Sequence, residues 1–140
     1  MEITRSSSIH TVKGPEAWFT GDVYIDAVAA APAPARVQAN LVHFTPGART
    51  AWHTHPLGQT IYATEGTGLV QRRGDPIEII RPGDRVFFEP DEDHWHGAAP
   101  NRFMVHLALN EVDDAHVAVN WGDKVTDEEY AAAPVRPSAD

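Results

Sequence analysis

The chain has 140 residues, a length that suits one domain, and 42% of them are hydrophobic, which is enough for a core. Its formal net charge of −9 argues against nucleic-acid binding, because phosphate contacts need clustered lysine and arginine. The sequence contains no cysteine and no apolar run near the roughly 20 residues of a membrane span, and its first residues lack the apolar core of a signal peptide. We therefore expect a cytoplasmic protein.

Residues 36–112 are expected to form the core of a β-barrel. Runs rich in β-branched and aromatic residues are separated there by turn signals such as Pro46-Gly47 and Pro82-Gly83-Asp84. The expected strands are residues 38–45, 49–54, 60–64, 68–72, 77–80, 85–89, 94–97 and 103–110. Many short strands at this spacing predict an all-β sandwich or barrel in a single domain.

The stretch before this core, residues 1–35, is expected to be an N-terminal arm with one edge strand. That strand is expected at Val23 to Val28. The alanine- and proline-rich stretch from Ala29 to Ala35 follows it, and we expect an extended linker there because proline disfavours a helix.

The stretch after the core, residues 113–140, is expected to hold a C-terminal strand, a short helix and a tail. Thr126 and Glu129 match a capping box, with threonine at the N-cap and glutamate three residues later. The helix is expected to run to about Ala132. Pro134 and Pro137 then stop it, and the last residues are expected to fray.

Histidines in a repeated spacing are the strongest functional signal. Five of the eight histidines fall in one pattern: His53 and His55, His94 and His96, and then His106. Side chains two residues apart on a strand point to the same face, so each pair can converge on one point. Imidazole is a favoured ligand of several transition metals, which predicts a shared metal site. Gln59 returns to the same point if residues 56–58 make a bend.

Strand parity also predicts the walls of a cavity beside this metal site. Five side chains share the inward parity: Asn40, Val42, Phe44, Ala108 and Asn110. Trp52 and Trp95 alternate with the histidines, so we expect them to face the opposite way and to serve as packing residues.

The chain resembles the cupin family in two motifs. The first motif is matched by Gly47, His53, His55, Gln59 in the place of the usual glutamate, and Gly66. The second is followed more loosely by Gly83, Pro90 and His94. This resemblance implies a small double-stranded β-helix, or jelly-roll barrel, with one metal ion inside.

A closer resemblance is to the bacterial cupin-type hydroxynitrile lyases, and it covers nearly the whole chain. It rests on residues 13–21, 46–60, 94–100, 106–108 and 125–130. It implies one Mn²⁺ ion per chain held by His53, His55, Gln59 and His94, with Fe²⁺, Zn²⁺, Ni²⁺ and Co²⁺ as alternatives. It also implies a small-molecule substrate, no nucleic acid or membrane partner, and a homo-oligomer, a dimer or a tetramer, in which the apolar N-terminal arm takes part.

This resemblance predicts a lyase that cleaves or forms cyanohydrins. Neutral imidazoles and a neutral amide leave the charge of the metal uncompensated, which favours binding and ionisation of a substrate hydroxyl. His96 and His106 are the candidates for proton transfer and cyanide stabilisation, because the expected hairpin between their strands brings the two rings together. Two other functions stay open: a metal-dependent dioxygenase and a cupin that binds a small metabolite without catalysis.

Overall fold

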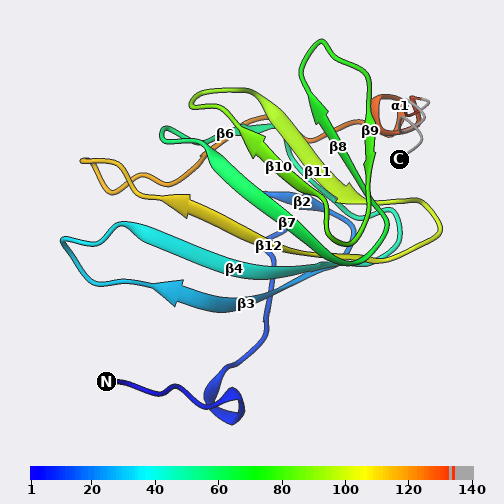
Figure 1. Cartoon of the computed structure of the whole chain (residues 1–140). Helices are drawn as coiled ribbons and strands as arrows, with labels where there is room; N and C mark the ends of the chain where they lie inside the picture. Colours follow the sequence, from blue (N-terminus) through cyan, green and yellow to red (C-terminus); the bar gives the residue numbers. More distant parts are fainter. Residues whose placement is uncertain (133, 135–140) are drawn as a thin grey trace.

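The computed structural model describes residues 1–132 and 134 of the chain. Two antiparallel sheets face each other in this part of the chain and enclose a core (Figure 1). The elements are η1 (Ser6–Ser8), β1 (Val12–Lys13), β2 (Phe19–Thr20), β3 (Val23–Ala30), β4 (Val37–Phe44), β5 (Arg49–Thr50), β6 (His53–Thr54), β7 (Gln59–Gly66), β8 (Gly68–Arg72), β9 (Glu78–Ile80), β10 (Arg85–Phe88), β11 (His94–Ala98), β12 (Met104–Glu111), β13 (Asn120–Trp121) and α1 (Asp127–Tyr130).

One sheet, called sheet A here, has the strand order β1-β3-β4-β12-β7-β10. The other, sheet B, has the order β13-β6-β11-β5-β2, and β8 joins it by pairing with β11 and with β9. These sheets and the short helix α1 confirm the predicted all-β barrel with a C-terminal helix. Among residues 1–132 and 134, no helix is long and apolar enough to cross a membrane.

Alternating side chains build the core between the sheets. The long strands β4 and β12 pair along their whole lengths, with Phe44 opposite Met104 and Val42 opposite His106. Because neighbouring residues of a strand point to opposite faces, these four side chains all turn inward, and all four are buried. The inner face of sheet A is therefore apolar at one end of the barrel.

A second, smaller cluster of apolar side chains lies outside the main core. Trp52 and Trp95 are both in it, together with Val125, and Tyr130 of α1 packs against it. This confirms that the two tryptophans face away from the histidines. Each indole N–H has a partner, since Trp52 donates to Glu129 at 3.1 Å and Trp95 donates to Gln71 at 2.7 Å.

The C-terminal helix begins as predicted. The Thr126 hydroxyl accepts from the backbone N–H of Glu129, and the Glu129 carboxylate accepts from the backbone N–H of Thr126, so both halves of the capping box form. The helix ends at Tyr130, two residues before the expected end. Pro137 and the expected frayed tail lie outside the described residues.

Two expectations about strands are wrong in detail, and two short strands were missed. The strand expected at residues 49–54 is divided into β5 and β6. Between them, the backbone N–H of Ala51 donates to the carbonyl oxygen of Trp18, and that of Trp52 donates to the carbonyl oxygen of Asp123. Ala29 and Ala30 belong to β3 instead of the linker, because a bulge after Ala27 keeps them paired with β4. The two-residue strands β1 and β2 were not expected, since two residues show no alternation.

The expected hairpin between residues 94–97 and 103–110 is also wrong. β11 pairs with β8 in sheet B, whereas β12 pairs with β4 and β7 in sheet A. The chain crosses from one sheet to the other through residues 99–103. The two strands therefore face each other across the barrel interior.

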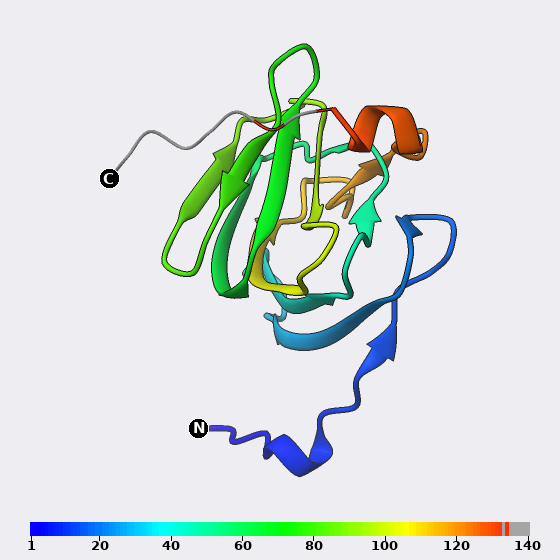
Figure 2. The same ribbon diagram turned by 90° about the vertical axis from the view of Figure 1, so that its right-hand side faces the viewer.

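The N-terminal segment, residues 1–11, lies apart from the barrel in both views (Figures 1 and 2). Its side chains are all exposed, including Ile3 and Ile9. It reaches the barrel through β1, which pairs with β3 at the edge of sheet A.

Candidate metal centre and cavity

Three buried histidines are oriented in the same way by the backbone. The Nδ1 atom of each ring lies within hydrogen-bond distance of a carbonyl oxygen: His53 to Ala51 at 2.9 Å, His55 to Ala118 at 2.7 Å and His94 to Glu92 at 2.7 Å. A carbonyl oxygen only accepts, so Nδ1 carries the proton in each neutral ring. The lone pair is then on Nε2, which is the arrangement that second-sphere bonds give to metal-binding histidines.

Two of these histidines and Gln59 each have a buried polar atom without a protein partner. Among the described residues, Nε2 of His55, Nε2 of His94 and Oε1 of Gln59 are buried and make no hydrogen bond. An unpaired buried polar atom costs about 1–3 kcal/mol, so a bound group that satisfies these atoms is favoured. Three atoms that each offer a lone pair in this way fit a divalent transition metal.

The protonation state of the rings also fits a metal. Burial lowers the pKa of His53 well below its usual value, and its histidine neighbours lower it further. Burial lowers the pKa of His55 as well, and it lowers the pKa of His94 to about 3. The rings are therefore neutral near pH 7, as a metal ligand must be.

Two sets of histidines could hold a metal ion, one with His55 and one with His96. The rings of His53 and His94 are 4.2 Å apart, and the ring of His55 lies 5.0 Å from that of His53. However, the three residues whose ligand atoms all lie within 4.8 Å of one another are His53, His94 and His96. The structure thus brings His96 closer to this cluster than the sequence predicted. The carbonyl bonds orient His55 and not His96, which favours the predicted set.

His94 is placed differently from the other predicted ligands. Its ring stacks on Phe88 with centroids 3.7 Å apart, and its side chain is completely buried. His53, His55 and Gln59 line the cavity, whereas His94 is not among its lining residues. His94 would hold an ion together with His53, whose ring is 4.2 Å from its own.

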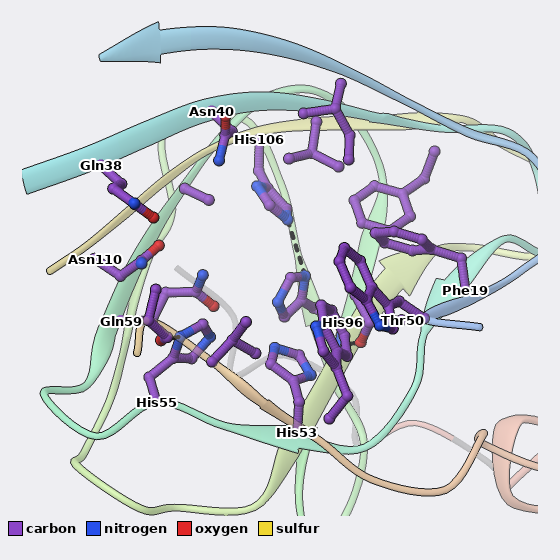
Figure 3. Close-up of a pocket in the computed structure, with 18 residues that line it drawn as sticks. Phe19, Gln38, Asn40, Thr50, His53, His55, Gln59, His96, His106 and Asn110 are labelled. Atoms are coloured by element: carbon purple, nitrogen blue, oxygen red, sulfur yellow. Dashed lines mark hydrogen bonds between the residues drawn. The ribbon is translucent and has the colours of Figure 1, made fainter. Parts of the chain in front are cut away.

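His96 and His106 meet across the barrel. His106 Nε2 lies 2.9 Å from His96 Nδ1, and both side chains are buried (Figure 3). Burial lowers both pKa values, that of His106 to about 3, so both rings are neutral near pH 7. The outer nitrogens, Nε2 of His96 and Nδ1 of His106, have no partner among the described residues. The pair can therefore hold its shared proton on either ring.

The cavity beside the histidines has the walls that strand parity predicted. All five expected side chains line it: Asn40, Val42, Phe44, Ala108 and Asn110. Its further lining residues are Trp18, Phe19, Ile25, Gln38, Thr50, Ala118, Val119 and Trp121. Carboxamides gather at one end of the cavity and Phe19 lies at the other (Figure 3).

Comparisons with known proteins agree with this geometry. The family model of the cupin domain matches residues 40–108. A protein named (R)-mandelonitrile lyase from Granulicella tundricola is 56% identical over 130 residues, which cover 93% of this chain and 98% of that protein. The chain belongs to the cupin family.

Solved cupin structures resemble this one closely. A cupin-like protein from Thermotoga maritima superimposes with a TM-score of 0.79 at 39% identity, covering 84% of this cupin and 89% of that chain. A polyketide cyclase from Streptomyces resistomycificus has a TM-score of 0.73 at 17% identity, covering 93% of this cupin and 90% of that chain. The second likeness shows the fold alone.

Several cavity residues of this cupin were missed from the sequence. Gln38 shares the parity of Asn40 two residues later, so the same alternation identifies it. Ala118 and Val119 come from an irregular segment, and no periodicity marks them. Trp121 reaches the cavity because the two-residue strand β13 pairs it with His53.

Trp121 also closes the cavity beside the metal centre. Its ring stacks on Trp18, with centroids 5.1 Å apart and planes 7° apart, and lies 4.7 Å from the ring of His53. Its indole nitrogen is buried, without a hydrogen-bond partner in the described chain. This side of the cavity is therefore an aromatic wall with one hydrogen-bond donor that has no partner in the described chain.

Proposed function

We propose that this cupin is a metal-dependent hydroxynitrile lyase that cleaves or forms cyanohydrins. The relative named (R)-mandelonitrile lyase, 56% identical over nearly the whole chain, supports this reaction. The observation that carries the proposal is the buried His96–His106 pair at 2.9 Å, which stands in one cavity with the histidine cluster. Cyanohydrin cleavage moves one proton without redox change, and a positioned imidazole is suited to that transfer.

One divalent ion, Mn²⁺, is assigned to four ligands, His53, His55, Gln59 and His94. The carbonyl-bonded Nδ1 atoms and the unpaired inward atoms support this set, and the family resemblance supports manganese. When bound, the ion supplies Lewis acidity to the oxygen of the substrate hydroxyl or carbonyl.

His96 and His106 move the proton. A neutral His96 with its proton on Nδ1 accepts the proton of the cyanohydrin hydroxyl at Nε2, while the Nδ1 proton passes to Nε2 of His106. The carbon–carbon bond breaks, and its electron pair leaves with cyanide. The proton on His96 Nε2 is then given to cyanide, which leaves as hydrogen cyanide beside the aldehyde or ketone. His106 returns its extra proton to His96 Nδ1, and both rings are neutral again.

Burial suits this pair to release the proton. The low pKa of His106 means that an imidazolium in this place holds its proton weakly. Hydrogen cyanide holds a proton far more tightly, so protonation of the departing cyanide is favourable. The apolar side chains of Phe19, Phe44 and Val42 line the same cavity.

The proposal extends to a homo-oligomer, a dimer or a tetramer. Val12 and Val28 are exposed at the edge of sheet A, by 61% and 58%, and Ile9 is exposed on the N-terminal segment. On the outer face of the same sheet, Phe87 and Tyr62 are 56% and 44% exposed. Val12 and Val28 are on β1 and β3 at one edge of the sheet, and Tyr62 and Phe87 are on β7 and β10 at the other edge. Exposed apolar side chains of this kind favour burial against another copy of the chain.

Elemental analysis combined with a cyanide-release assay tests the proposed function. Purified protein is analysed for bound metals, and its release of cyanide from mandelonitrile is then measured before and after chelation. The account predicts bound manganese and metal-dependent release. Bound metal without release from any aromatic cyanohydrin would leave only a metal-binding cupin.

A further inference from the structure

Three carboxamides form one row on the inner face of sheet A. Gln38 of β4 lies directly opposite Asn110 of β12, and Asn110 lies opposite Gln59 of β7. Side chains in such cross-strand positions have Cβ atoms roughly 5 Å apart. We call Gln38, Asn110 and Gln59 the carboxamide row. The row leads from the proposed metal ligand Gln59 across the sheet, and Asn40 lies beside it (Figure 3).

The hydrogen-bonding capacity of these groups is unused. Oε1 of Gln59 is buried without a partner, and no side-chain hydrogen bond of Gln38, Asn40 or Asn110 occurs among the described residues. Gln71, elsewhere in the barrel, shows the contrast, because its amide donates to Asp75 and accepts from Trp95, both at 2.7 Å. The carboxamides of the cavity are therefore available to a ligand.

The deeper rows of the same sheet are apolar except for Asn40 and His106. Asn40 lies opposite Ala108, then Val42 opposite His106, then Phe44 opposite Met104. Gln38, Asn40 and Asn110 are only half-buried, whereas the deeper side chains are buried, so solvent reaches the cavity from the row. His106 is four residues from Asn110 along β12, roughly 13 Å.

This arrangement orients the substrate. The inference rests on the proposed function, in which cyanide leaves at the His96–His106 pair. Gln59 is both a proposed metal ligand and a member of the row, so the row begins at the reacting end of the cavity. The part of the substrate remote from the reacting carbon then points along the row towards Asn110 and Gln38.

Charge decides which substituent fits there. Among the described residues, the cavity is lined by no lysine, arginine, aspartate or glutamate. A carboxylate or an amine beside the carboxamide row would therefore meet no ionic side chain of opposite charge. A primary carboxamide both donates and accepts, as a hydroxyl group does. We propose that the carboxamide row selects aldehydes, and their cyanohydrins, that carry a neutral hydroxyl group remote from the reacting carbon.

The test compares two aldehydes of the same shape, 4-(hydroxymethyl)benzaldehyde and 4-ethylbenzaldehyde. Calorimetry gives their dissociation constants for the metal-loaded protein and for the chelated protein. We expect the hydroxylated aldehyde to bind about tenfold more tightly to both forms of the protein. The ethyl compound has no hydroxyl group and leaves the carboxamides unpaired. In Asn110→Leu and, independently, in Gln38→Met, the ratio should fall towards one, whereas Asn101→Leu on an exposed turn should keep it.

Equal binding of the two aldehydes, no binding of the hydroxylated one, or an unchanged ratio in both variants would overturn the inference. Turnover of the two cyanohydrins separates this result from the proposed function. Selective binding without any cyanide release would reject the lyase and leave the carboxamide row standing. Cyanide release without selective binding would support the lyase and reject the role of the carboxamide row.

Discussion

His106 Nε2 and His96 Nδ1 lie 2.9 Å apart, and this contact joins the two sheets of the barrel. It joins two neutral imidazoles in a chain. The two outer nitrogens of this chain are Nε2 of His96 and Nδ1 of His106. Since each ring has one proton, a proton taken up at His96 Nε2 displaces another towards His106. The contact is thus a route for one proton that leaves the metal ligands unchanged.

Replacing His106 should remove catalysis and spare the metal. His106→Ala is expected to lower kcat/KM for mandelonitrile by roughly 10²-fold, the usual scale for a lost general base. Metal content should stay close to that of the wild type, and the protein should still fold, with a lower melting temperature because a buried side chain is removed. His43→Ala, on the outer face of sheet A, is the control. Unchanged turnover would make His106 a packing residue, and loss of metal would make it a ligand.

Variants of His55 and His96 distinguish the two possible sets of metal ligands. In His55→Ala, purified from medium with manganese, we expect most of the bound metal to be lost, as in His53→Ala and His94→Ala. His96→Ala should keep its metal and lose turnover, because the account assigns His96 to proton transfer with His106 and not to the metal. Elemental analysis of the four variants decides the matter. Metal retained in His55→Ala and lost in His96→Ala would assign the ion to His53, His94 and His96.

The stability of the metal-free protein should fall in acid. The pKa of His106 is about 3 in the folded protein and near 6.5 when unfolded, so the unfolded state binds more protons between these values. The free energy of unfolding therefore decreases as the pH falls through this window. Near pH 5 this one group should cost about 2 kcal/mol.

Urea unfolding near pH 7 and near pH 5, with a chelator present, measures this effect. His106→Leu removes the titrating group, so its loss of stability over the same interval should be smaller than that of the wild type. An equal loss in the two proteins would show that His106 does not titrate in this way.

The exposed apolar edge of sheet A should bind a second copy. Sedimentation at micromolar concentration is expected to show a dimer or a tetramer of the 15.3 kDa chain. Val12→Asp combined with Val28→Asp should shift the protein towards smaller species, because both side chains would then place charge in the contact. A wild type that sediments only as a single chain would reject the homo-oligomer.

The local chemistry of the site was predictable from the sequence. Two-residue spacing put His53 beside His55, and strand parity found Asn40, Val42 and Asn110 in the cavity wall. Such features depend on alternation within one strand, which the sequence contains. The capping box at Thr126 was equally local, because its two hydrogen bonds join residues three apart.

Relationships between strands were less predictable. The His96–His106 contact was expected from a hairpin, yet it forms between opposite sheets, since pairing depends on where each strand finds its neighbours. Ala118 accepts from His55 although it lies 63 residues away in an irregular segment. The carboxamide row likewise depends on the registers of β4, β12 and β7, which alternation alone does not fix.

Cleavage of mandelonitrile without oxygen tests the central claim most directly. Manganese-loaded protein is mixed with mandelonitrile under anaerobic conditions, and benzaldehyde and cyanide are measured together. The account predicts that both products appear in equal amounts, that chelation stops the reaction, and that His106→Ala shows little of it. Turnover that requires oxygen would indicate an oxygenase, and no turnover of any aromatic cyanohydrin by fully metal-loaded protein would contradict the lyase.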